Sequence, residues 1–329
     1  MTSKGCVNRG TTARITDSLK LSNFTVFDEV TPHPSIEDLR QAQSKLQDLD
    51  IEQIVAIGGG SVLDFAKLLA LVLHPENRQL EAWDTCTSDV GNARCLPVIA
   101  LPTTTGTGSE VTPFATIWDK EKLKKYSIEN INLAPSISMI CPEPLNTMHS
   151  DLLLVSVYDS LSHCAETLWN RNSTPLTRSF AREGIRCVAS GFLKMLVRED
   201  TSFALEDFQV GSLLGGLAIS NNYTALAHAI SYHLTLNFGI PHGLASSFLL
   251  PEISEFVLSS ASLEPNNLEA LKIASQIITD QKVKDRVRQQ LPLFDIDDLV
   301  QDVWSANRLA NFLIELRQDE LTTFLATAI

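Results

Sequence analysis

The chain has 329 residues, of which 44% are hydrophobic, and its formal net charge is −13 with a pI near 5.0. This length and apolar content allow a large core and suggest two domains, while the acidic balance argues against a nucleic-acid or anionic-membrane partner. No apolar run is long enough to span a bilayer, and six cysteines without a CxxC pair indicate neither a zinc ribbon nor a disulfide framework. We therefore expect a reduced, cytoplasmic protein.

The first third of the chain alternates strand and helix patterns. We predict a strand over residues 23–27, a helix over 35–49, a strand over 52–57 and a long apolar helix from residue 61 onward. The helix at 35–49 has Ser35 as its expected N-cap. Such alternation is typical of an α/β domain with a parallel sheet.

Three glycines separate the second predicted strand from the long helix. Gly58, Gly59 and Gly60 would let the backbone approach a pyrophosphate, and the N-terminus of the following helix offers free N–H groups. The spacing is not GxGxxG, however, and Ser61 with Asp64 also fits a capping box. A purely structural turn is therefore an equal alternative at this point.

A second loop of small polar residues changes that balance. The strand predicted at 96–101 runs into a loop that contains Thr103, Thr104, Thr107 and Ser109. Hydroxyl groups and glycines at the carboxyl end of a parallel strand lie where an open α/β sheet holds its ligand. A merely polar turn is the less favoured alternative.

The chain changes character near residue 148. Before it, residues 114–119 and 126–128 flank a charged run and predict a β-hairpin. After it, helical periodicity dominates over 151–171, 175–197, 203–220, 223–236, 244–259, 266–277 and 311–328. We predict a nucleotide-binding α/β domain over residues 1–147 and an all-helical domain over 148–329.

The helical half contains a set of candidate metal ligands. Asp159 and His163 are four residues apart on a predicted helix, so both can face one ion. His228, His233 and His242 crowd into one later segment, and a carboxylate with imidazoles suits Fe(II), Zn(II), Co(II) or Ni(II). Taken alone, the Asp159–His163 pair is more simply a helix-end charge and a surface pair.

Together these motifs resemble the iron-containing (group III) alcohol dehydrogenase family, in its order and spacing over almost the whole chain. The residues that carry the resemblance are Gly58–Ser61 with Asp64 and Lys67, residues 102–104 and 108–110, Asp159 with His163, and His228 with residues 241–243. The resemblance implies a Rossmann-like domain followed by an all-α domain, the dehydroquinate synthase-like architecture. It also implies an NAD(P)-dependent alcohol dehydrogenase or aldehyde reductase that uses Fe(2+), or Zn(2+), with NAD(H) or NADP(H).

The resemblance assigns roles to individual residues. Asp159, His163, His228 and His242 fall on the metal-ligand positions, whereas His233 does not. The cofactor-binding positions are occupied by Gly58, Gly59, Gly60, Ser61, Asp64, Thr103, Thr104, Thr107, Ser109 and Lys125. Tyr232 stands where the family often has a histidine, and we expect its hydroxyl to pass a proton during catalysis.

Several phrases are similar to the phosphonoacetaldehyde reductase branch. They lie at residues 113–119, 124–127, 168–175 and 227–232. We therefore expect reduction of phosphonoacetaldehyde to 2-hydroxyethylphosphonate, with a general iron-dependent alcohol dehydrogenase, a dehydroquinate synthase-like lyase and a non-catalytic truncated homologue as alternatives. The lyase is disfavoured because cationic substrate contacts are not found near the motifs. A small-molecule substrate is implied, and a homodimer is left open.

Two features bear on that expectation. The chain begins at what resembles the end of the family's first Rossmann strand, so we expect a leading hairpin and that strand to be missing from the nucleotide-binding domain. A phosphonate also needs a nearby cation, and Arg171, Lys124 and Lys125 are the candidates. For Arg171, a solvated charge at a helix end is an equally good explanation.

Overall fold

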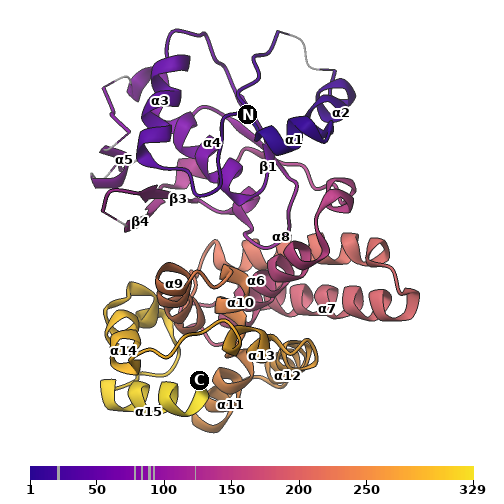
Figure 1. Cartoon of the computed structure of the whole chain (residues 1–329), viewed down its shortest axis with the longest axis vertical. Helices are drawn as coiled ribbons and strands as arrows, with labels where there is room; N and C mark the ends of the chain where they lie inside the picture. Colours follow the sequence, from indigo (N-terminus) through magenta and orange to yellow (C-terminus); the bar gives the residue numbers. More distant parts are fainter. Residues whose placement is uncertain (21–22, 78, 83, 88–89, 92, 123) are drawn as a thin grey trace. The chain divides into compact units, whose positions relative to one another are not determined.

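The computed structural model describes residues 1–329 except 21–22, 78, 83, 88–89, 92 and 123 (Figure 1). The chain divides into two compact units. The first contains residues 1–104 and 109–148, and the second contains residues 105–108 and 149–329. The short segment 105–108 therefore belongs to the second unit, although the first unit surrounds it in the sequence.

A three-stranded parallel sheet with strand order β1-β2-β5 forms the centre of the first unit. The strands are β1 (Ile54–Gly58), β2 (Val98–Pro102) and β5 (Ile137–Ser138), and an antiparallel hairpin is formed by β3 (Phe114–Asp119) and β4 (Lys124–Glu129). Gly58 pairs with Pro102 at the carboxyl ends of β1 and β2. The glycine turn and the hydroxyl-rich loop therefore begin side by side.

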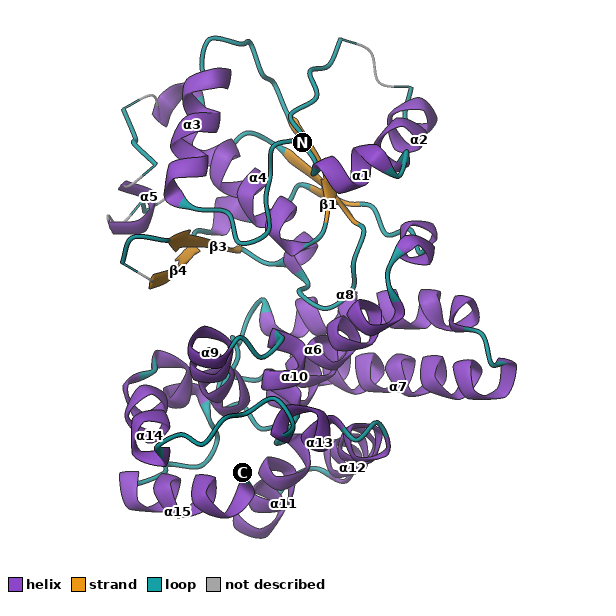
Figure 2. Ribbon diagram, viewed as in Figure 1, coloured by secondary structure: helices purple, strands orange, loops and turns teal. Residues whose placement is uncertain are grey.

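The helices of the first unit surround this sheet (Figure 2). They are α1 (Lys4–Asn8), α2 (Thr11–Ser18), α3 (Ile36–Leu46), α4 (Gly60–Val72) and α5 (Asp84–Thr87). α4 packs against β1, β2 and β3 and is buried at nearly every position, as expected for a helix that is apolar on all sides. Ser35 and Asp38 form a complete capping box at α3, which confirms the predicted start of that helix.

In the part of the second unit that the structure describes, all regular elements are helical. They are α6 (Ser150–Leu168), α7 (Pro175–Arg198), α8 (Leu205–Ile219), α9 (Leu226–Phe238), α10 (His242–Ser247), α11 (Leu250–Ser260), α12 (Pro265–Asp280), α13 (Val283–Arg288), α14 (Ile296–Ser305) and α15 (Gln318–Ala328). α6 is buried without interruption from Val157 to Leu168 and contacts α7, α8, α9, α10 and α12. It is the central helix of this unit.

Some predicted elements differ from the structure. Residues 23–27 do not form a strand, and the only ladder contact nearby among the described residues is an isolated bridge between Ser3 and Glu29. The helix predicted at 244–259 is divided into α10 and α11, because Pro251 cannot continue a helix from the preceding turn. α13 and α14 were not predicted, and α15 begins at Gln318 rather than at 311.

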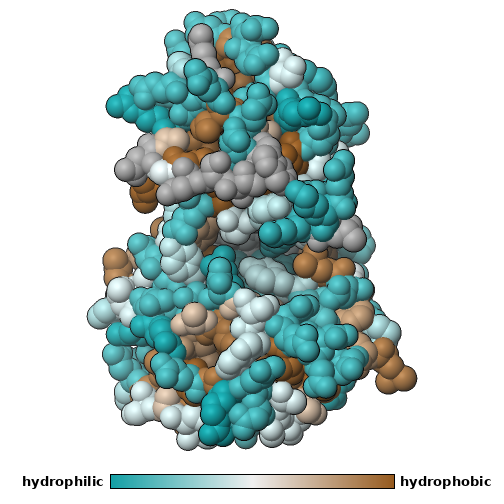
Figure 3. Space-filling model, turned by 90° about the vertical axis from the view of Figure 1, so that its left-hand side faces the viewer, coloured by the Kyte–Doolittle hydropathy of each residue, from teal (hydrophilic) through white to brown (hydrophobic). Residues whose placement is uncertain are grey.

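The surface that Figure 3 draws is mainly hydrophilic, with hydrophobic side chains in separate groups. No helix among the described residues has the length and apolar character needed to span a membrane.

Candidate functional site

α6 supplies two of the predicted metal ligands. Asp159 and His163 lie one helical turn apart, and their side chains are only 8% and 6% exposed. His163 Nε2 is 4.0 Å from Asp159 Oδ1. A carboxylate and an imidazole at i and i+4 lie on the same helix face, and here both are enclosed by the surrounding helices.

α9 and α10 supply the other two histidines. His228 lies in the first turn of α9, and His242 is the first residue of α10. Gly239, with φ +68°, ends α9 in the left-handed region and allows the chain to turn toward α10. Gly243 then lets α10 approach α6 closely, because a Cβ built on it would lie 1.9 Å from the carbonyl oxygen of Val155.

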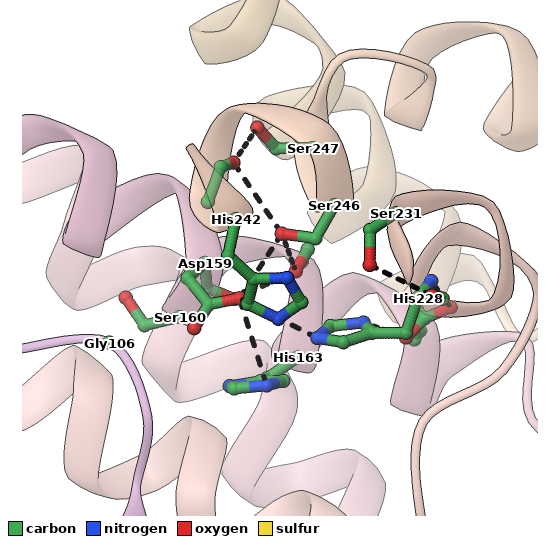
Figure 4. A network of polar contacts seen from close by, with 12 residues as sticks. Gly106, Asp159, Ser160, His163, His228, Ser231, His242, Ser246 and Ser247 are labelled. Carbon is green, nitrogen blue, oxygen red and sulfur yellow. Dashed lines mark hydrogen bonds and ion pairs between the residues drawn. The ribbon is translucent and has the colours of Figure 1, made fainter. Parts of the chain in front are cut away.

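The three imidazole side chains converge on one oxygen atom of Asp159 (Figure 4). Asp159 Oδ1 is 3.5 Å from His228 Nε2 and 3.7 Å from His242 Nε2, as well as 4.0 Å from His163 Nε2. In a tetrahedral site with metal–ligand bonds of about 2.1 Å, ligand atoms stand about 3.4 Å apart. The observed spacing therefore fits a single metal ion of the transition series.

The chemistry of these atoms also fits a metal. His228 Nε2 is buried and has no hydrogen-bond partner among the described residues, so a bound ion would satisfy it. The ligand atoms of Asp159, His163 and His228 all lie within 4.8 Å of one another. His242 completes the set at its edge, where its side chain is 35% exposed. One carboxylate and three imidazoles are donors that Fe(II) and Zn(II) accept.

The electrostatic environment favours the protonation states that bind a metal in two of these residues, Asp159 and His163. Burial alone would raise the pKa of Asp159, but the three imidazoles, His163 first, hold that pKa well below its usual range. Burial lowers the pKa of His163 to about 4, although Asp159 opposes this effect. Burial also disfavours the charged form of His228, yet the Glu166 and Asp159 carboxylates raise the pKa of His228 to about 10. At neutral pH the cluster therefore contains an ionised carboxylate and a neutral His163.

Two buried residues that were not predicted support the cluster. Glu166 Oε2 lies 2.6 Å from His228 Nδ1, and the Ser246 hydroxyl donates a hydrogen bond of 3.1 Å to Asp159 Oδ1. A sequence pattern for Glu166 was present, because Asp159, His163 and Glu166 at i, i+4 and i+7 share one helix face. Ser246 follows His242 by one turn, but nothing in the sequence pairs it with Asp159.

Tyr232 and His233 differ in their surroundings although they are adjacent. The Tyr232 ring is parallel to the His242 ring, with an interplanar angle of 3° and centroids 6.1 Å apart. His233 instead places Nδ1 at 2.6 Å from Asp302 Oδ2 on α14. The Asp302 carboxylate therefore satisfies the buried His233 ring without a metal. This agrees with the motif resemblance, in which His233 does not fall on a metal-ligand position.

The predicted cofactor loops meet in the first unit. Thr103 donates its backbone N–H to the Gly58 carbonyl at 2.9 Å, and a Cβ on Gly59 would lie 3.0 Å from Thr104 Oγ1. Gly59 is the N-cap of α4, and no side chain caps this helix end. The helix N-terminus therefore retains the backbone groups that a pyrophosphate would use.

The capping box considered for α4 is not formed. Asp64 instead accepts hydrogen bonds from Ser109 Oγ at 2.5 Å and from the backbone N–H of Thr116 at 2.9 Å. Lys67, fully buried, donates to the carbonyls of Thr112 and Phe114 at 2.9 and 2.8 Å. The two side chains thus tie α4 to the second loop and to the start of β3.

The remaining predicted residues belong to other elements of the chain. Thr107 belongs to the segment 105–108, which is part of the second unit. Lys125 lies on β4, with its ammonium group 5.8 Å from the centre of the Trp118 ring. Arg171 Nε donates to the Phe312 carbonyl at 2.9 Å, and its guanidinium lies 3.5 Å from the Glu315 carboxylate. These contacts favour a structural role for Arg171.

Both halves of the chain match models of one protein family. Residues 1–142 match the family model described as iron-containing alcohol dehydrogenase, and residues 154–329 match the C-terminal model of the Fe-containing alcohol dehydrogenase family. A crystal structure of sulfoacetaldehyde reductase from Bifidobacterium kashiwanohense in complex with NAD+ is 26% identical with a TM-score of 0.86, and covers 99% of this chain and 89% of that chain. The fold class predicted from the sequence is confirmed.

Curated sequences are also similar. Probable alcohol dehydrogenase EutG from Escherichia coli (strain K12) is 32% identical over 250 residues, which are 75% of this chain and 62% of the relative. Phosphonoacetaldehyde reductase from Streptomyces viridochromogenes is 32% identical over 259 residues, which are 77% of this chain and 65% of the relative. The matched part thus spans slightly less than two thirds of either relative. The chain belongs to the iron-containing alcohol dehydrogenase family.

Proposed function

We propose that the protein is a metal-dependent aldehyde reductase linked to NAD(H) or NADP(H). The observation that carries this proposal is the convergence of three imidazole Nε2 atoms within 3.5–4.0 Å of Asp159 Oδ1. A metal held there would supply Lewis-acid polarisation of a carbonyl group, and the reduced nicotinamide would supply hydride. Asp159, His163, His228 and His242 are the proposed ligands, with Fe(2+) as the proposed ion and Zn(2+) as the alternative.

Tyr232 is the proposed proton donor. His242 is the most exposed of the proposed ligands, at 35% compared with 3–8% for the others. We therefore expect substrate to reach the cluster on the His242 side. The Tyr232 ring is parallel to that of His242, and a phenolic hydroxyl can donate a proton to the alkoxide that hydride addition produces.

The first unit is the proposed cofactor-binding part. The open N-terminus of α4 at Gly59, beside Thr104, is suited to a pyrophosphate, because free N–H groups and the helix dipole attract anions. The proposed contacts in this unit are Gly58, Gly59, Gly60, Ser61, Asp64, Thr103, Thr104, Ser109 and Lys125, and Thr107 of the segment 105–108 is also proposed. The NAD+ complex of the related sulfoacetaldehyde reductase supports a dinucleotide as the ligand.

For the substrate, we propose phosphonoacetaldehyde, with 2-hydroxyethylphosphonate as the product. The similarity to the Streptomyces viridochromogenes phosphonoacetaldehyde reductase supports this choice. A general alcohol dehydrogenase is the second candidate, and the similarity to EutG favours it. A non-catalytic homologue is disfavoured, because a protein without activity would not need the four proposed ligand side chains to be present and close together.

One experiment distinguishes these candidates. The purified chain, reconstituted with Fe(2+), should oxidise NADH or NADPH when phosphonoacetaldehyde is added, with a higher kcat/KM than for lactaldehyde or acetaldehyde. The His242→Ala variant serves as the control without metal. A preference for the neutral aldehydes would assign a general alcohol dehydrogenase. No turnover in a chain with one metal per protein would indicate a non-catalytic homologue.

The Arg171→Ala variant tests how the phosphonate is recognised. Because the guanidinium already binds the Phe312 carbonyl and Glu315, we expect the variant to lower stability. The ratio of kcat/KM between phosphonoacetaldehyde and lactaldehyde should then stay within about twofold, since each tenfold change needs about 1.4 kcal/mol of differential binding. A selective loss of more than about tenfold for the phosphonate would instead make Arg171 a substrate contact.

A further inference from the structure

Glu166 is a completely buried carboxylate in the central helix of the second unit, with 0% of its surface exposed. Acidic side chains are almost never buried to this degree unless they are paired. Both of its oxygens contact His228, which is 62 positions away in the sequence. Oε2 lies 2.6 Å from the ring nitrogen Nδ1, and Oε1 accepts a 3.2 Å hydrogen bond from the backbone N–H.

We infer that Glu166 is a positioning residue for the metal centre, which holds the His228 ring with Nε2 directed at Asp159. This inference rests on the metal site of the proposed function and adds a residue to it. The role follows from three features of the contact, which concern the backbone, the ring and the helix face.

The backbone contact fixes where α9 begins. His228 is in the first turn of α9, where backbone N–H groups have no partner within the helix. The N-cap residue, Ala225, has no side chain that could accept these hydrogen bonds. The carboxylate of Glu166 accepts one of them from a different helix. It therefore sets the position of the His228 backbone relative to α6.

The ring contact fixes which nitrogen faces the cluster. An ionised carboxylate only accepts hydrogen bonds, so Nδ1 of His228 must carry the proton that Oε2 receives. In the neutral ring that a metal binds, the lone pair is then on Nε2, the atom that lies 3.5 Å from Asp159 Oδ1. The neighbouring His163 ring, nearly parallel at 15° with centroids 4.8 Å apart, restricts rotation of the His228 ring further.

One face of α6 carries Glu166 together with two of the proposed ligands. Asp159, His163 and Glu166 stand at i, i+4 and i+7 of α6, so they lie along one side of the helix. One rigid element thus provides two ligands and the support of a third. Because α6 is buried from Val157 to Leu168, its position is set by the core of the second unit.

The chain offers a matched control for this contact. On the same helix, α9, His233 Nδ1 lies 2.6 Å from the Asp302 carboxylate on α14, the same atom type at the same distance. His233 is not one of the four converging side chains. A change at Asp302 therefore removes a carboxylate–histidine contact of α9 without touching the proposed metal site.

The experiment measures Co²⁺ binding to the metal-free full chain, by competition with a chelator and from the Co²⁺ visible absorption spectrum. In Glu166→Gln, the amide oxygen can accept from only one of the two His228 donors, the backbone N–H or ring Nδ1, and the NH₂ group faces the other donor. We expect it to weaken Co²⁺ binding about 10–100-fold and to alter the spectrum. Glu166→Asp keeps both acceptors but draws them back, so its affinity should lie between those of Glu166→Gln and the unchanged chain. Asp302→Asn should stay within about threefold of the unchanged chain.

The outcomes separate this inference from the metal site itself. If the unchanged chain does not bind one Co²⁺, the metal site and this inference both fail. If it binds Co²⁺ and Glu166→Gln binds equally well with the same spectrum, only the positioning role is overturned. An equal loss in Asp302→Asn also overturns it. Should Glu166→Gln not fold, Glu166→Asp decides, and an affinity equal to that of the unchanged chain refutes the role.

Discussion

The approach of α10 to α6 predicts that one methyl group, added to a residue that is not itself a proposed ligand, disrupts the proposed metal centre. In the Gly243→Ala variant, the added Cβ would lie 1.9 Å from the Val155 carbonyl oxygen and 3.2 Å from the Asp159 backbone nitrogen. Backbone atoms cannot swing aside as the end of a flexible side chain can. The two helices must therefore separate.

The size of the effect follows from this distance. Cβ atoms essentially never approach other heavy atoms within 3.0 Å, so α10 must move by about 1.1 Å from its present 1.9 Å contact. Metal–ligand distances tolerate deviations of only about 0.2 Å, and His242 is the residue next to Gly243. We expect metal affinity to fall at least about tenfold, and overpacking to cost about 1–3 kcal/mol of stability.

The assay is Co²⁺ affinity together with the unfolding midpoint of the metal-free chain. Gly239→Ala is the matched control, because its Cβ would meet nothing within 4 Å while its φ of +68° is unfavourable for alanine. That variant should lose about 1–2 kcal/mol of stability and keep its metal affinity. If Gly243→Ala binds Co²⁺ as tightly as Gly239→Ala does, α10 is not positioned by this contact and the reasoning is wrong.

Two further predictions concern the first unit. Gly60→Val, at the first residue of α4, should weaken NADH binding at least about tenfold, because a branched side chain blocks the approach of a pyrophosphate. The metal content of this variant should not change. An unchanged NADH affinity in a fluorescence titration would contradict the prediction. Burial lowers the pKa of Lys67 to about 8 from 10.5. Between these values the unfolded chain binds the proton and the folded chain does not, so the free energy of unfolding relative to Lys67→Met should rise from pH 8 to 10.5. Denaturant unfolding at both pH values measures this difference in free energy of unfolding. A difference that does not change between the two pH values would contradict the prediction.

Local sequence patterns predicted most elements, and their failures have local causes. The capping residue Ser35 marked the start of α3 correctly. In the run after His242, Pro251 marks the point where one helix cannot continue. α14 was not predicted, although Ile296, Leu299, Val300 and Val303 have helical spacing. The sequence therefore contains a local signal for both of these differences.

The strand predicted at residues 23–27 failed for a different reason. Phe24 and Val26 alternate with polar residues, but they are 52% and 49% exposed in the structure. A strand requires a neighbour with which it exchanges backbone hydrogen bonds over several residues. Here Phe27 accepts one hydrogen bond from Thr2, at 2.8 Å. Alternation within a segment cannot show whether such a neighbour is present.

The contacts around the proposed metal ligands were less accessible to sequence reasoning than the proposed ligands themselves. Asp159 and His163 form a local pattern, whereas the contact of Glu166 with His228 depends on how α6 packs against α9. The same holds for Ser246 and Asp159, which are 87 residues apart. Pairings over such distances depend on the packing of the whole unit.

The segment 105–108 packs against helices of the second unit. The Gly106 backbone N–H donates to Ser212 Oγ at 2.6 Å, and a Cβ on Gly108 would lie 2.3 Å from the Gly216 Cα of α8. Both glycines have positive φ, +110° and +60°, so no other residue fits there without strain. The loop that carries Thr107 is therefore shaped by helices of the second unit. A change in α8 can alter a proposed nucleotide contact without touching the glycine turn at α4.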